Sequence, residues 1–190
     1  MIPVFTRRAA AVLLACAAAA PAWAQEAPRV RFATSLGEFV VELYPDKAPR
    51  TVENFLQYVR DKHYDGTIFH RVIDGFMVQG GGFTAQMQQK ATRAPIPLEV
   101  RPDLKNDRGT IAMARTSNPN SATAQFFINV VDNRNLNAPL PDGHGYAVFG
   151  RVVSGMDTID KIKAVPTGTM GPFQNVPATP VVIVSATLVK

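Results

Sequence analysis

The chain has 190 residues, of which 46% are hydrophobic and 18% are charged; this is enough apolar material for one core of ordinary size, and it excludes wholesale disorder. Its formal net charge of +5 is spread over scattered lysines and arginines with no run of five, which argues against a dedicated nucleic-acid-binding protein. The 15 prolines and 13 glycines indicate many turns and short elements rather than a helical bundle.

The first 24 residues have the pattern of a secretory signal peptide. Arg7 and Arg8 precede an unbroken apolar run over 9–20, and the small-residue triplet 22–24 ends the segment. The apolar run is shorter than the roughly 20 residues of a membrane span. We therefore expect cleavage after residue 24, which leaves a mature chain with a net charge of +3 and no membrane span. We also expect this chain to lie in the periplasm of a bacterium.

Cys16 is the only cysteine of the chain, and it lies inside the predicted signal peptide. A mature chain without cysteine has no disulfide, no thiol nucleophile and no cysteine-based metal site. The segment 13–16 also resembles a lipoprotein processing site, so a lipid anchor through Cys16 is a less favoured alternative. An uncleaved N-terminal anchor is a second alternative.

The mature chain begins with a predicted β-hairpin. Residues 29–34 and 38–43 each alternate between apolar and polar side chains, and Gly37 lies in the turn between them. We expect the apolar face of this hairpin to lie on the core. Its apolar positions are Val30, Phe32, Phe39, Val41 and Leu43.

The period then changes to that of a helix. Apolar residues recur at i, i+3, i+4 and i+7 over 52–59, which predicts a helix that Thr51 caps, with Pro49 just outside it. A second, shorter helix is predicted over 156–162. Six further segments have strand patterns, and the last of them is β-branched. These segments are 67–73, 76–79, 110–114, 125–130, 146–153 and 181–189.

About eight short strands and two helices without a break in composition predict one mainly β domain over residues 25–190. Eight strands that must hide their edges favour a closed eight-stranded antiparallel β-barrel capped by the two helices. Composition alone leaves a β-sandwich as an alternative.

Several kinds of chemistry find no support in the sequence. The three histidines, His63, His70 and His144, lack the spacing of metal ligands. No serine has the Gly-x-Ser-x-Gly context of a hydrolase. The glycines at 80–82 are not followed by Lys-Ser or Lys-Thr, so we interpret them as a strand-ending turn rather than a phosphate-binding loop.

Two dense segments carry the polar residues that stand out. Residues 69–83 read FHRVIDGFMVQGGGF, where Arg71 lies between apolar strand residues and Gln79 ends an apolar run. Residues 124–130 read AQFFINV. From the pattern alone, Arg71 is an outward-facing side chain on a solvated strand face, and at least one phenylalanine of the second segment belongs to the core.

These segments, together with GTIAMAR at 109–115 and GYAVFGRVVSGMD at 145–157, resemble the cyclophilin family of peptidyl-prolyl cis-trans isomerases. The resemblance runs from about Val30 to the C-terminus, and with the export signal it points to the bacterial periplasmic branch. It implies an eight-stranded antiparallel barrel capped by two helices, in agreement with the strand count. It further implies an enzyme without cofactor or metal that isomerises X-Pro bonds of proline-containing polypeptides while exported proteins fold. Separately, we expect the chain to be a monomer.

The resemblance assigns the catalytic role to one residue. Arg71 corresponds to the catalytic arginine of the family, and Phe76, Met77 and Phe127 line its proline pocket, with Leu136 in the pocket wall. An arginine suits this reaction because the prolyl nitrogen gains a lone pair when the amide twists, and a charged donor stabilises only that state.

The resemblance also places polar and backbone groups around this pocket. Gln79 and Gln125 belong to the same groove, and Ala114 would contact the peptide through its backbone. His70 lies beside the arginine on the site surface, and Tyr146 completes the substrate-binding set.

The chain departs from many family members at three positions. Arg115 and Tyr146 stand where many members have Asn and His, and Asn135 falls near the position of a Trp that is frequent in eukaryotic members. These departures affect groove selectivity, so strong sensitivity to cyclosporin-type ligands is not expected. The arginine and the aromatic residues are unchanged, which favours an enzyme over the alternative, a non-catalytic proline-binding chaperone.

Overall fold

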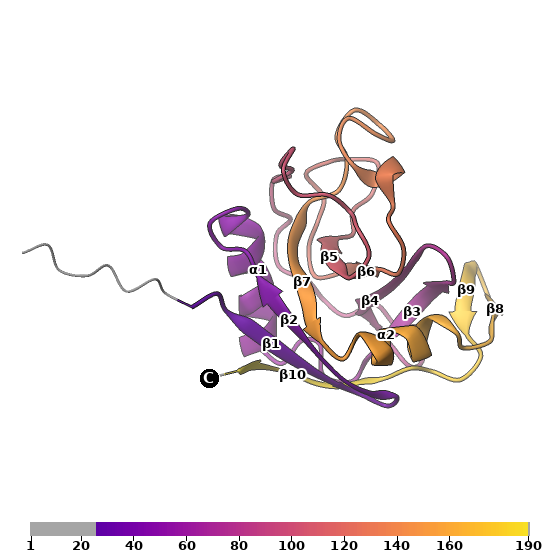
Figure 1. Cartoon of the computed structure of the whole chain (residues 1–190). Helices are drawn as coiled ribbons and strands as arrows, with labels where there is room; N and C mark the ends of the chain where they lie inside the picture. Colours follow the sequence, from indigo (N-terminus) through magenta and orange to yellow (C-terminus); the bar gives the residue numbers. More distant parts are fainter. Residues whose placement is uncertain (1–25, 190) are drawn as a thin grey trace, which may run out of the picture.

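The computed structural model describes residues 26–189 (Figure 1). The predicted signal peptide (1–24) and Cys16 therefore lie outside the described residues. The helices are α1 (Pro49–Arg60), α2 (Met156–Lys163) and the short 3-10 helix η1 (Arg134–Leu136). The strands are β1 (Arg29–Thr34), β2 (Gly37–Leu43), β3 (Thr67–Ile73), β4 (Met77–Thr84), β5 (Thr110–Met113), β6 (Phe126–Asn129), β7 (Val148–Ser154), β8 (Thr167–Met170), β9 (Phe173–Pro177) and β10 (Ile183–Val189).

Eight strands form one antiparallel sheet in the order β10-β1-β2-β7-β5-β6-β4-β3, which confirms the mainly β prediction with two helices. The sheet curls into an open half-barrel (Figure 1), so the closed barrel expected from the sequence is wrong. Its two edges approach each other at an isolated bridge between Ile68 and Val182, and the N–H groups of Gly66 and Phe69 donate to the carbonyls of Ile183 and Val181. Pro180, which has no backbone N–H, interrupts the segment before β10, and a continuous ladder to β3 is not formed there.

Aromatic rings fill the concave side of the sheet. Phe32 on β1 lies opposite Phe39 on β2, and their rings stack with centroids 4.8 Å apart. Phe126 on β6 packs edge-on against Tyr64 at 5.5 Å. Buried residues alternate with intermediate or exposed ones over Arg29–Phe32 and Glu38–Leu43, which puts Phe32 and Phe39 on one face, as the hairpin prediction expected.

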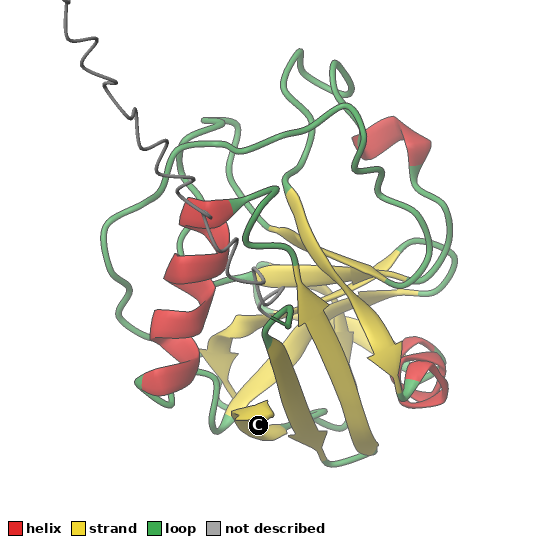
Figure 2. Cartoon of the chain, turned by 60° about the vertical axis from the view of Figure 1, so that its left-hand side comes forward, coloured by secondary structure: helices red, strands yellow, loops and turns green. Residues whose placement is uncertain are grey.

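The two helices cover opposite sides of the curled sheet (Figure 2). Helix α1 begins at Pro49, which occupies its first turn, so Thr51 lies within the helix and is not its N-cap. The cap comes from elsewhere: the Glu99 carboxylate accepts hydrogen bonds from the backbone N–H groups of Arg50 (3.2 Å) and Thr51 (2.7 Å). A carboxylate at this end also interacts favourably with the helix dipole.

The three glycines at 80–82 lie inside β4 and do not form the strand-ending turn expected from the sequence. Gly81 has φ +84°, and a Cβ there would come within 2.8 Å of the Tyr64 ring. At Gly82 a Cβ would come within 2.5 Å of Gln125 Cγ. At Gly81 the positive φ and the neighbouring rings exclude a side chain, whereas at Gly82 a side chain would displace that of Gln125.

One further pair of strands was not predicted. β8 and β9 form a separate two-stranded sheet, the β8–β9 hairpin, which lies beside β3 (Figure 1). All four residues of β8 are exposed, so this strand has no apolar alternation from which a sequence pattern could have found it.

Candidate active site

A β-bulge in β3 brings two consecutive polar residues to the outer face of the sheet. Phe69 pairs with Gly80, whereas Arg71 pairs with Gln79, so β3 holds one residue more than β4 between these pairs. Phe69 and Val72, three positions apart, both belong to the core. A regular strand would point them to opposite faces. The extra residue of the bulge therefore allows Phe69 and Val72 to face the core together.

Alternation along the neighbouring strands supplies the apolar part of the site. On β4 and β6, Val78 and Phe126 face the core, whereas Met77 and Phe127 belong to a second, smaller apolar cluster on the outer face. The two phenylalanines of AQFFINV thus have different environments, in line with the expectation that at least one belongs to the core. Leu136 of η1 joins the outer cluster.

A cavity opens on this outer cluster, and we call it the arginine cavity. Its volume is about 100 Å³. Arg71 lies on its border together with the apolar side chains, so the arginine faces outward, as its strand pattern indicated, but into a cavity rather than open solvent. Eight of the ten residues predicted for the site line it, and Arg115 is the ninth lining residue. The eight are Arg71, Phe76, Met77, Gln79, Ala114, Phe127, Leu136 and Tyr146.

A chain of hydrogen bonds runs along the polar side of the arginine cavity. Gln79 Nε2 donates to Gln125 Oε1 at 3.0 Å, and Arg71 Nη1 donates to Gln79 Oε1 at 3.4 Å. Gln79 therefore connects the guanidinium to Gln125 with its amide orientation fixed at both ends. The missing side chain of Gly82 leaves the space in which Gln125 lies.

His70 and Gln125 do not line the arginine cavity. They line an adjoining depression, the hairpin groove, which Arg71 and Gln79 share with the cavity. His70 is 5% exposed, and its burial, with a smaller contribution from the nearby Arg71 charge, lowers its pKa to about 4. The imidazole is therefore neutral near pH 7. The groove is lined by His70, Arg71, Gln79, Phe83, Gln125, Pro172, Phe173, Gln174 and Asn175.

Arg115, one of the departures from the family pattern, does not extend into the cavity as a free cation. Its side chain is 1% exposed and forms an ion pair with Asp142 (2.8 Å), and its Nη2 donates to the Gly145 carbonyl (2.8 Å). The guanidinium carbon lies 4.4 Å from the centre of the Tyr146 ring, which packs edge-on against Phe127. Two of the three departures thus contact each other through a cation–π interaction.

Three buried asparagines behind the cavity, Asn106, Asn129 and Asn133, stabilise its wall, and they were not predicted from the sequence. Asn133 Nδ2 donates to the Phe76 carbonyl (2.8 Å) and to Asn129 Oδ1 (2.7 Å). Asn106 Nδ2 donates to the Leu136 carbonyl at 3.2 Å. One signal was available for Asn129, because it follows Phe127 by two positions on β6 and shares its face.

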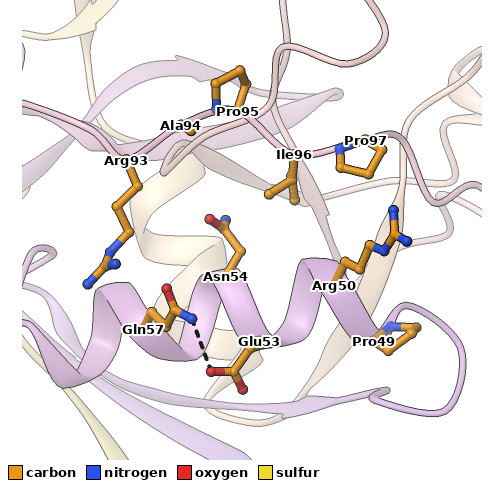
Figure 3. A pocket seen from close by; sticks show the side chains of 10 residues that line it. All are labelled: Pro49, Arg50, Glu53, Asn54, Gln57, Arg93, Ala94, Pro95, Ile96 and Pro97. Carbon is orange, nitrogen blue, oxygen red and sulfur yellow. Dashed lines mark hydrogen bonds between the residues drawn. The ribbon is translucent and has the colours of Figure 1, made fainter.

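The largest hollow near α1 lies away from these residues. It has a volume of about 660 Å³ and lies between α1 and the segment 93–97 (Figure 3). Its polar side chains already have partners: Asn54 donates to the Thr123 carbonyl, Gln57 to Glu53, and Arg93 to Asp61. No set of free polar groups converges there within the described residues apart from the exposed Arg50, so the hollow is not a candidate active site.

Within residues 26–189, no three histidine, cysteine or acidic side chains are grouped as metal ligands. The same residues contain no helix that is long and apolar enough to cross a membrane.

Comparison with known proteins supports the resemblance found in the sequence. Residues 29–188 match the family model described as cyclophilin type peptidyl-prolyl cis-trans isomerase/CLD. The chain is 61% identical over 159 residues to a peptidyl-prolyl cis-trans isomerase of Streptomyces antibioticus, covering 83% of this chain and 96% of the relative. It is 57% identical over 161 residues to isomerase B of Escherichia coli, covering 84% of this chain and 98% of that protein.

A further relative and a solved structure extend this comparison. Isomerase A of Dickeya dadantii is 52% identical over 183 residues, which cover 96% of both chains. A crystal structure of a cyclophilin type isomerase of Cryptosporidium parvum aligns with a TM-score of 0.72 at 27% identity, covering 86% of this chain and 98% of that one.

Proposed function

The chain belongs to the cyclophilin-type peptidyl-prolyl cis-trans isomerase family and is an isomerase of that class; from this premise we propose that the arginine cavity is its active site. In this proposal Arg71 stabilises the twisted amide, and the apolar side chains hold the prolyl ring. The observation that carries it is the location of Arg71 on the border of a cavity that Phe76, Met77 and Phe127 also line.

The reaction needs no bond to break. Rotation about a peptide bond faces a barrier of about 18–20 kcal/mol because the nitrogen lone pair is shared with the carbonyl. In the twisted amide the lone pair is localised on the prolyl nitrogen. An enzyme accelerates the rotation by binding this twisted state more strongly than either planar form.

Arg71 is suited to make that distinction. Its guanidinium is always charged and presents several donors in a fixed fork. A hydrogen bond from it to the prolyl nitrogen is favourable only when the lone pair is localised. Such charge-assisted bonds contribute about 1.5–3 kcal/mol, and each factor of ten in rate needs about 1.4 kcal/mol. This interaction therefore accounts for about a tenfold to hundredfold acceleration, and the contacts that hold the ring supply the remainder.

The outer apolar cluster is suited to that grip. A proline ring is small, rigid and apolar, and aromatic walls hold such a ring without a specific polar contact. The buried asparagines keep the wall fixed through the backbone carbonyls of Phe76 and Leu136. Ala114 N–H already donates to the Gln125 carbonyl, so we expect its carbonyl oxygen to be the group that receives a peptide N–H.

The substrates are proline-containing polypeptides. In support, a second crystal structure of the Cryptosporidium parvum cyclophilin type isomerase was determined in the presence of the dipeptide Ala-Pro, and it aligns with this chain with a TM-score of 0.71 at 27% identity. The signal-peptide pattern of residues 1–24 supports a role in the folding of exported proteins in the periplasm.

Turnover of the Arg71→Ala variant tests the arginine mechanism. In a protease-coupled assay with a short proline peptide, we expect kcat/KM to fall at least tenfold, with an unchanged urea midpoint, because Arg71 lies outside the core. Arg60→Ala on the exposed side of α1 serves as the matched control and retains full activity. Full turnover in Arg71→Ala would refute the mechanism. Peptide binding without turnover in the unmutated protein would instead favour the proline-binding chaperone.

A further inference from the structure

We propose that the hairpin groove binds the residues of the substrate polypeptide that adjoin the proline on one side, so that the enzyme recognises a longer segment than the X-Pro unit. The inference rests on the proposed function of the arginine cavity. It assigns a substrate contact to the β8–β9 hairpin, an element outside the main sheet.

The groove is continuous with the arginine cavity. Arg71 and Gln79 line both, so a polypeptide with its proline in the cavity can continue past this shared border into the groove. The groove has a volume of about 480 Å³, compared with about 100 Å³ for the cavity. It therefore offers space for more of the chain than the ring alone.

Aromatic rings form an apolar wall of the groove. Phe173 at the start of β9 packs edge-on against Phe83 with ring centroids 5.3 Å apart. Phe83 in turn lies 4.6 Å from the His70 ring. This stack of rings anchors the β8–β9 hairpin to the end of β4, so that the hairpin forms a fixed wall of the groove.

The remaining wall carries uncharged groups that both donate and accept hydrogen bonds. Gln125, Gln174 and Asn175 each present a side-chain amide. Among residues 26–189, no acidic side chain lines the groove, and Arg71 is its only cation because His70 is neutral near pH 7. Amides match the alternating N–H and C=O groups of an extended peptide backbone, and the aromatic wall suits an apolar side chain on it.

Peptides of different length distinguish this proposal from its premise. We would measure KM for a tetrapeptide centred on Ala-Pro and for two octapeptides that extend it by four residues at either the N-terminal or the C-terminal end. We expect one of the octapeptides to have a KM at least threefold below that of the tetrapeptide. Equal KM values for all three peptides would overturn the inference and leave the proposed function intact.

Two groove variants and one control test whether the hairpin groove causes the lower KM of the favoured octapeptide. Gln174→Ala removes an exposed amide, and Phe173→Leu keeps an apolar anchor for the hairpin while removing the ring. We expect both variants to raise KM for the favoured octapeptide at least threefold and to leave tetrapeptide turnover unchanged. Thr169→Ala, exposed on β8 away from the groove, should change neither.

Two outcomes distinguish a failure of the groove inference from a failure of the proposed function. If the groove variants lower turnover of the tetrapeptide and the octapeptides equally, with unchanged urea midpoints, the groove does not bind flanking residues and the inference is wrong. If the Arg71→Ala variant also turns over the tetrapeptide at the normal rate, the proposed mechanism itself is wrong.

Discussion

Phe126 and Phe127 are neighbours in sequence and have the same side chain, yet they face opposite sides of one sheet. Phe126 contacts the rings of Phe32, Phe55, Tyr64 and Phe69 within the core. Among the described residues, Phe127 has one aromatic partner, Tyr146, and it borders the arginine cavity. The core ring is held from several directions, whereas the outer ring leaves room for a ligand. We infer that Phe126 mainly stabilises the fold, whereas Phe127 mainly contributes to substrate binding.

The largest effect is expected for the inner ring. Phe126→Ala should lower the free energy of unfolding by about 3–5 kcal/mol, because it removes a fully buried ring from a packed cluster. Urea melts followed by circular dichroism measure this loss. A loss below that of Phe127→Ala would contradict the division between the two faces.

The outer ring should affect activity more than stability. We expect Phe127→Ala to raise KM for a short proline peptide at least tenfold and to destabilise the protein less than Phe126→Ala does. Its side chain borders a cavity that already exists, so its removal creates less new cavity volume. Phe127→Leu is the matched control and should recover much of the lost binding. Unchanged KM in Phe127→Ala would place the proline elsewhere.

Gly81 and Gly82 of β4 allow a second comparison between a position that faces the core and one that faces the proposed site. Gly81→Ala puts a methyl group against Tyr64 and Phe126 at a positive φ, and we expect about 1–3 kcal/mol of destabilisation. Gly82→Ala instead meets Gln125, which can turn away at the loss of its hydrogen bond to Gln79. We expect Gly82→Ala to lower kcat several-fold with a smaller change in the urea midpoint. The reverse order of the two variants would contradict this assignment.

The smallest effect concerns the ion pair at the cavity wall. Its hydrogen bond from Arg115 lowers the pKa of Asp142 to about 2, below the value of roughly 3.9 expected in the unfolded chain. The folded state therefore binds this proton less readily. The stabilising contribution is complete above about pH 4 and is lost as the pH falls towards 2.

Removing the cation tests this pairing. In Arg115→Met we expect the pKa of Asp142 to return towards roughly 3.9, measured by carboxyl chemical shifts in an NMR titration. KM at pH 7 should rise about twofold to fivefold as Tyr146 loses its cation. A pKa of Asp142 that stays near 2 in this variant would show that another group holds the carboxylate.

Local patterns in the sequence predicted the eight strands of the main sheet and the two helices α1 and α2 well. The alternation in β1 and β2 and the helical period of α1 depend on neighbours along the chain, so they are visible without the fold. The residues that the family resemblance assigned to the site come together in the structure, eight around the arginine cavity and two in the hairpin groove. Their catalytic and binding roles remain predictions.

The features that escaped prediction depend on partners distant in sequence. Glu99 caps α1 from about fifty residues away, and Arg115 meets Asp142 across a long loop. Asn106 contacts the backbone of Leu136, again through the tertiary fold. No local pattern encodes such contacts, and the exposed strand β8 has no apolar face to indicate it. The failure of the barrel to close likewise depends on how two distant edges meet.

The bulge of β3 has a consequence for protein engineering. Anyone who transplants this site to another sheet must copy the additional backbone residue along with the side chains, because a regular ladder with Phe69 on the interior would turn residue 70 outward and residue 71 inward. Deleting His70 would restore a regular ladder that keeps Val72 inward and Arg71 outward, but it would remove one of the two consecutive polar side chains from the outer face. The geometry of the proposed active site thus depends on the number of residues in β3 as well as on their identities.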